Sequence, residues 1–145
     1  MKIGDTVNYV YGTEEVGAAL LGKIVKKVFI SPSGDYIRFV TNVDDVFALG
    51  SGDCCSVSWI NNITGIHNLI GQTVVEIRVK NEGLIEKPNT TDNDQEEMSY
   101  YALTLITEKG FCDIEFRNSS NGCYGGDLAL CSPVSSCTKE VTEDF

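Results

Sequence analysis

Two polar stretches of the sequence, residues 50–58 and 117–124, hold most of the side chains that could bind a small molecule. Their hydroxyl, amide, carboxylate and guanidinium groups can hydrogen-bond to a polar ligand, and an indole or phenol ring can stack on a ligand ring. The candidate ligand-binding residues are Asp53, Ser56, Trp59, Arg117, Asn118, Ser120, Asn121 and Tyr124. If the two halves of the chain are related by a pseudo-two-fold axis, the two stretches can face one another across one pocket.

The structural alternative is that these stretches are only turns. Asn121-Gly122 is typical of a type I′ turn, and an aspartate such as Asp53 often caps a turn. Arg117 is the residue that we expect to bind an anionic ligand, because a guanidinium can contact phosphate or carboxylate through two donors. Arg38 and Arg78 fall on expected strands, where side-chain alternation directs each to solvent or to a pocket, and solvent is the default.

The sequence offers little for catalysis. His67 is the single histidine and is expected on a solvated turn, whereas acid–base catalysis usually needs a histidine or a buried carboxylate pair. The six cysteines include no C-x-x-C spacing, and the adjacent Cys54 and Cys55 would point to opposite faces of a strand. We therefore predict a non-catalytic protein with no metal and no cofactor. A cysteine-dependent hydrolase is the enzymatic alternative.

Charge narrows the class of partner. The chain of 145 residues has a formal net charge of −10. A nucleic-acid duplex or an anionic membrane needs a basic face, so neither is an expected partner. A small anionic ligand is compatible with this charge, because a few basic side chains can bind it locally. Since no stretch resembles a signal peptide or a membrane span, we expect a cytoplasmic protein with reduced cysteines.

Alternating apolar residues then indicate the elements that must position these side chains. Short strands are predicted at residues 24–30, 36–41, 46–49 and 55–60, and polar turns separate them. Helical turns are predicted at 13–20, with Thr13 as the N-cap, and at 65–70. Residues 81–97 are polar and acidic, and we expect an exposed, mobile loop there.

The pattern of residues 20–60 recurs at residues 69–124. Leu20-Leu-Gly22 matches Leu69-Ile-Gly71, and each copy continues into an apolar strand. This predicts a mainly β fold: two similar antiparallel meanders from an internal duplication, packed as a small sandwich or half-open barrel with one or two short helical turns. We expect a single domain at residues 1–130, with a polar, flexible C-terminal tail at residues 131–145.

Several motifs resemble an uncharacterised domain family found mainly in tailed-phage genomes. They are Asp53-Cys54-Cys55, Thr107-Glu-Lys-Gly110 and Ser120-Asn-Gly-Cys-Tyr124, and the resemblance covers roughly residues 20–127. It implies a phage-encoded β-protein that acts in the host cytoplasm and whose family has no settled activity.

The function that we expect is binding of a small polar ligand without turnover. The specific hypothesis is a phage counter-defence protein that sequesters a nucleotide immune signal, such as a cyclic or ADP-ribose-derived nucleotide. Such a protein could act as a homo-oligomer. The alternative is an acidic interaction module that inhibits a host protein through its surface charge.

Overall fold

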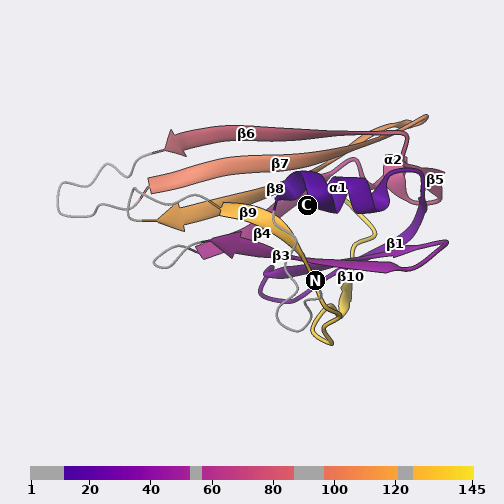
Figure 1. The fold of residues 1–145 in the computed structure, drawn as a ribbon, viewed down its shortest axis with the longest axis horizontal. Helices are drawn as coiled ribbons and strands as arrows, with labels where there is room; N and C mark the ends of the chain where they lie inside the picture. The colour runs from indigo at the N-terminus through magenta and orange to yellow at the C-terminus, as the bar shows by residue number, and fades with distance from the viewer. Residues whose placement is uncertain (1–11, 53–56, 87–96, 121–125) are drawn as a thin grey trace.

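The computed structural model describes residues 12–52, 57–86, 97–120 and 126–145, which form two antiparallel sheets and two short helices (Figure 1). The helices are α1 (Thr13–Leu20) and α2 (Ile66–Leu69). The strands are β1 (Ile24–Ile30), β2 (Tyr36–Thr41), β3 (Asp45–Gly52), β4 (Val57–Thr64), β5 (Gln72–Thr73), β6 (Glu76–Glu86), β7 (Glu97–Thr107), β8 (Gly110–Ser120), β9 (Gly126–Cys131) and β10 (Lys139–Glu140). The predicted mainly β fold with two packed antiparallel sheets is confirmed.

Each sheet is built on one meander, β1-β2-β3 or β6-β7-β8, and receives β9 or β4 from the other half of the chain; the first sheet also contains the two-residue strands β5 and β10. The first sheet has the order β10-β1-β2-β3-β9, with β5 also paired to β1, and the second has the order β4-β8-β7-β6. The fourth strand of each half therefore crosses to the opposite sheet. Because β3 leads into β4 and β8 leads into β9, both crossings occur at the same end of the two-layered fold.

The core lies between the sheets and follows the alternation of the strands. On β8, Cys112, Ile114, Phe116 and Asn118 point inward and are buried. Tyr101 of β7 stacks on Phe116, with ring centroids 5.4 Å apart. Helix α1 packs against β9, β6, β3 and β7 and so fills the side of the sandwich between two sheet edges. Its residue Gly17 lies so close to Ile77 that an added Cβ would be 2.6 Å from the Ile77 side chain.

The two halves begin with the same backbone arrangement, as the predicted repeat requires. Gly22 after α1 and Gly71 after α2 both have left-handed φ angles, of 83° and 81°. The Gly22 amide donates to the Val74 carbonyl at 2.8 Å, and the Gly71 amide donates to the Val25 carbonyl at 2.7 Å. These two bonds are equivalent under the shift of 49 residues that aligns the two glycines. The halves are thus joined by a reciprocal pair of hydrogen bonds.

Two expectations differ from the structure. The N-cap of α1 is Gly12, whereas Thr13 is the first helical residue and its hydroxyl accepts a hydrogen bond from the Leu128 amide of β9. The predicted 81–97 loop is partly strand, because β6 continues to Glu86 and pairs with β7 despite its polar sequence.

Residues 131–145, for which the sequence predicts a flexible tail, pack along both sheets. After β9 the chain reaches the far edge of the first sheet, where β10 pairs with β1 and the Val141 amide donates to the Val28 carbonyl. Phe145 then exchanges two backbone hydrogen bonds with Ile63 of β4, at 3.1 and 3.2 Å. Buried Cys137 and Val141 supply the apolar contacts that polar composition alone did not reveal.

Neither described helix is long and apolar enough to cross a membrane.

Candidate ligand-binding face

The alternation of β8 divides the predicted site residues between two faces of the sheet. Asn118 points into the core and is fully buried, whereas Arg117 points to the outer face and is partly exposed. Ser120 is placed by its backbone, which pairs with Glu97 of β7. Asp53, Ser56, Asn121 and Tyr124 lie outside the described residues.

The strand ends that flank the two predicted loops are brought together. Gly52 at the end of β3 pairs with Gly126 at the start of β9, and Val57 at the start of β4 pairs with Ser119 near the end of β8. Both loop connections therefore begin and end within one cluster of four strand ends.

Beneath that end of the sandwich lies a buried polar pair. The Asn118 Nδ2 donates to the Ser58 Oγ at 2.9 Å. The Asn118 Oδ1 is buried and has no hydrogen-bond partner among the described residues. A buried acceptor without a donor costs about 1–3 kcal/mol, and such groups commonly hydrogen-bond to water or to a ligand. Asn118 is the predicted residue with the strongest structural reason to contact a further polar group.

On the outer face, Trp59 and Arg117 are direct neighbours across β4 and β8, and Tyr100 of β7 pairs with Arg117 from the other side. The Arg117 Nε donates to the Glu115 Oε2 at 2.8 Å. Glu115 also accepts a hydrogen bond from the Asn61 amide. The guanidinium that the sequence favours for anion binding thus has an acidic neighbour on its own strand.

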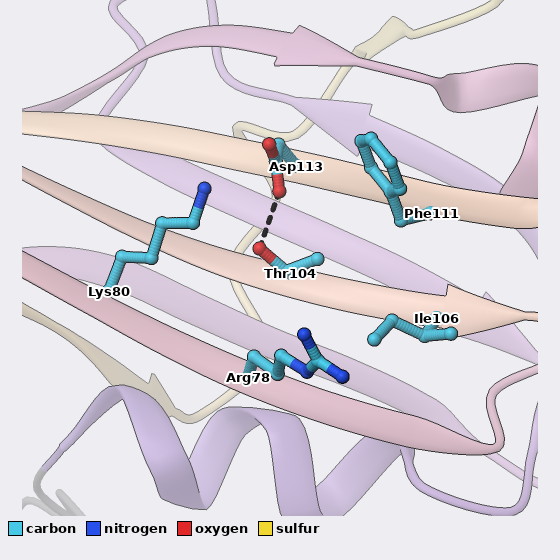
Figure 2. Close-up of a pocket in the computed structure, with 6 residues that line it drawn as sticks. All are labelled: Arg78, Lys80, Thr104, Ile106, Phe111 and Asp113. Carbon is cyan, nitrogen blue, oxygen red and sulfur yellow. Dashed lines mark hydrogen bonds between the residues drawn. The ribbon is translucent and has the colours of Figure 1, made fainter.

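A hollow of about 180 Å³ lies further along the same outer face, toward the β7–β8 turn. Its lining comes from three adjacent strands: Arg78 and Lys80 from β6, Thr104 and Ile106 from β7, and Phe111 and Asp113 from β8. Figure 2 shows Thr104 between these groups, with the two basic side chains on one side and Asp113 and Phe111 on the other. The register aligns Arg78 with Thr104 and Thr104 with Asp113, so three polar groups form one row across the sheet.

The polar groups of the hollow differ in the hydrogen bonds and ion pairs that they already form within the protein. The Thr104 hydroxyl donates to the Asp113 Oδ1 and fixes that carboxylate. The Arg78 Nε donates to the Glu76 Oε2 at 3.1 Å, but the Arg78 side chain is 66% exposed. Lys80 is exposed, and no ion pair joins it to the rest of the described chain. The hollow thus offers two cations, one anchored carboxylate and an apolar wall.

Sequence reasoning missed this hollow as a site. Arg78 was noted as a strand residue that could line a pocket, but its partners lie 26–35 residues later in the chain. The available signal was the alternation of charge along residues 76–80, with Glu76, Arg78 and Lys80 on one face. Only the register of three strands places these groups beside Asp113 and Phe111.

The described cysteines are poor nucleophiles. Cys112, Cys131 and Cys137 are free thiols. Burial raises the pKa of Cys112 to about 12, and burial with nearby Cys137 raises the pKa of Cys131 to about 11. These thiols stay protonated near neutral pH. Cys54 and Cys55 lie outside the described residues, and His67 is exposed on α2.

Within the described ranges, no group of three or more His, Cys, Asp or Glu side chains is arranged to hold a metal ion.

Comparison with known proteins gives a family and no relative of known activity. No curated protein and no solved structure matches the chain. A family model described as a domain of unknown function, DUF7448, matches residues 18–130 and so spans both meanders, the crossing strands and every residue of the hollow. The chain therefore belongs to the DUF7448 family.

Proposed function

We propose that the protein binds a small anionic, ring-containing ligand without turning it over, and that the ligand sits on the outer face of the β4-β8-β7-β6 sheet. The observation that carries this proposal is the hollow in which Arg78 and Lys80 face Phe111 and Asp113 across β7.

The charge of the hollow supports an anionic ligand. The protein carries a net charge of −10, yet two of its basic side chains, Arg78 and Lys80, line this one hollow. A guanidinium and an ammonium together suit phosphate or carboxylate, since the first binds through a fork of donors and the second as a point charge. Long-range repulsion by the acidic surface would slow the approach of an anion, so short-range contacts must supply the affinity.

The apolar wall supports a ligand with a ring. Phe111 is 53% exposed and borders the hollow together with Ile106. An exposed aromatic ring beside cations is a common platform for a nucleobase, because every base has a π-face that can stack. A nucleotide combines such a ring with an anion in one molecule.

A more specific proposal concerns the role of the protein in the cell. A phage-encoded member of this family would act in the host cytoplasm and sequester a nucleotide immune signal, such as a cyclic or ADP-ribose-derived nucleotide, by stoichiometric capture. Among the described cysteines, burial raises the pKa values of Cys112 and Cys131, which disfavours turnover through either thiolate and supports capture over conversion.

A capture-and-release assay tests the proposal. The full chain is incubated with a panel of nucleotides, separated from unbound material and denatured by heat, and the released molecules are identified by mass spectrometry. We expect one ligand to return intact at a stoichiometry near one per site. Arg78→Ala and Lys80→Ala should each weaken its binding at least tenfold, because a lost charge-assisted hydrogen bond costs roughly 1.5–3 kcal/mol.

Matched controls are Lys26→Ala and Lys27→Ala, which remove exposed cations from β1 on the other sheet and should leave binding unchanged. Release of a chemically altered ligand would overturn the non-catalytic proposal in favour of an enzyme. Failure to capture any nucleotide, with salt-sensitive binding to a basic protein instead, would overturn it in favour of the acidic interaction module.

A further inference from the structure

We propose that the hollow selects a nucleoside 5′-phosphate whose base presents two adjacent N–H donors, as guanine does, and that Asp113 is the residue that makes this selection. This inference rests on the proposed function and adds the class of ligand and the specificity-determining residue.

Asp113 is held in place but not neutralised. It lies on the outer face of β8, opposite Thr104, whose hydroxyl donates to the Asp113 Oδ1. In the part of the chain that the structure describes, no basic side chain forms an ion pair with this carboxylate. One oxygen is therefore anchored by the sheet, and the carboxylate still has lone pairs available for donors from a ligand.

A carboxylate discriminates among bases because it can only accept hydrogen bonds. The Watson–Crick edge of guanine presents two neighbouring donors, N1–H and the N2 amino group, which match the two oxygens of a carboxylate. Adenine and cytosine each place one amino donor beside a ring-nitrogen acceptor, whose lone pair would face the negative charge. Uracil flanks its single N3–H with two carbonyl oxygens. Among the four bases, guanine alone meets Asp113 without an opposed acceptor.

The rest of the hollow fits the remaining parts of such a nucleotide. Phe111 and Ile106 border the side next to Asp113 and can contact the face of the base (Figure 2). Arg78 and Lys80 lie on β6, which is two strands away from β8. Neighbouring strands are about 4.8 Å apart, so the backbones that carry the carboxylate and the two cations are separated by roughly 10 Å.

That separation favours a nucleotide over a smaller zwitterion. The ligand's donors and its anionic group must lie at opposite ends, as the base edge and the 5′-phosphate do on either side of a ribose. In an α-amino acid, by contrast, the ammonium and the carboxylate share one carbon. The hollow of about 180 Å³ is smaller than the roughly 300–1,000 Å³ of pockets that enclose a whole drug-sized ligand. The base would therefore occupy the part of the hollow beside Asp113 and Phe111, while the ribose and phosphate extend over β7 toward Arg78 and Lys80.

The experiment is a titration of the full-length protein with GMP, IMP, AMP, CMP and UMP by isothermal calorimetry at fixed salt. We expect GMP to bind at least tenfold more tightly than AMP, CMP or UMP, with IMP in between because inosine lacks the N2 amino group. Asp113→Asn should weaken GMP binding about tenfold and leave AMP binding within about twofold, because an amide can both donate and accept.

The matched control is Glu115→Gln, which changes another carboxylate on the same face of β8 but outside the hollow, and which should retain the preference for GMP. Thermal unfolding of each variant checks that it is folded. Equal binding of all five nucleotides, still weakened by Arg78→Ala, would overturn the selection by Asp113 and leave the proposed function standing. Binding of none of them, when the capture assay returns an anionic ligand of another class, would likewise overturn only this inference. If the capture assay also returns nothing, the proposed function fails as well.

Discussion

Arg38 on the outer face of the first sheet and Arg78 on the outer face of the second have different surroundings. Arg38 on β2 lies over the rings of Phe29 and Phe47, with its Cζ atom 5.4 and 5.6 Å from their centroids. It also donates to the Asp45 carboxylate through both Nε and Nη2. Arg78 on β6 donates to Glu76 through Nε and is 66% exposed.

This difference separates a structural cation from one that is available to a ligand. The neighbours of Arg38 in the sheet provide two aromatic faces and an acceptor, so a ligand would have to displace existing contacts. The chain that follows β9 also passes close to Arg38: burial raises the pKa of Cys137, and the charge of Arg38 offsets part of that rise. Beside Arg78, the neighbouring strand offers Thr104, whose hydroxyl is already used by Asp113. Arg78, which makes fewer contacts within the protein than Arg38, is also the arginine that lines the hollow.

The largest expected effect that tests this contrast is a loss of stability in Arg38→Ala. Two cation–π contacts of about 0.5–1 kcal/mol each, together with a partly exposed ion pair, give a loss of about 2 kcal/mol. For a chain of this size we expect the melting temperature to fall by about 4–8 °C in calorimetry. Ligand affinity should not change.

Arg78→Ala is the matched comparison. Its melting temperature should stay within about 2 °C of the wild type, since an exposed ion pair contributes at most about 0.5 kcal/mol, while its ligand affinity falls. The contrast between the faces would be wrong if the two variants lost stability to the same extent.

The sequence was sufficient to predict the strands, but not to predict which strands are neighbours or which surface sites the neighbours form. Alternation such as that of Tyr36–Thr41 fixes which residues point inward, because the period of a strand is two. Alternation does not say which sheet a strand joins, and so it left open that β4 and β9 exchange sheets. The hollow depends on the register of β6, β7 and β8, which is a long-range property set by packing. Adjacent Arg117 and Asn118 were predicted in one site because residues 117–124 were expected to form a loop, whereas β8 extends to Ser120 and its alternation points the two side chains to opposite faces.

A smaller effect is expected where the C-terminal segment ties the two sheets together. The backbone amides of Gly65 and Ile66 donate to the Asp144 carboxylate and hold its pKa below the ordinary value. We expect Asp144→Asn to lose about 0.5–1 kcal/mol at pH 7, in the lower range for a capping aspartate because the group is exposed. Urea denaturation measures this loss.

The lowered pKa of Asp144 also predicts the direction in which this stability difference changes with pH. Because the folded state lowers the pKa of Asp144, its contribution is fully present above the ordinary carboxylate pKa of about 3.9 and is lost as the pH falls from there through the lower pKa of the folded state. The stability difference between the wild type and Asp144→Asn should therefore shrink between pH 5 and pH 3. A difference that is equally large at pH 3 would show that the carboxylate charge is not what Gly65 and Ile66 recognise.

The smallest expected effect concerns Arg117 and Arg78, two cations on the same face. It distinguishes the site predicted from sequence around Arg117 from the hollow that Arg78 lines. Arg117 lies beside Trp59 and was the predicted anion-binding residue, but its Nε donates to Glu115. A ligand in the hollow would interact with Arg117 mainly through long-range charge, which water and salt screen. We expect Arg117→Ala to weaken ligand binding only about threefold, against at least tenfold for Arg78→Ala, when both are measured by calorimetry in the same buffer. A loss in Arg117→Ala that equals or exceeds the loss in Arg78→Ala would move the ligand toward the strand ends around Trp59. There, on the other side of the sheet, the buried Asn118 Oδ1 has no partner among the described residues.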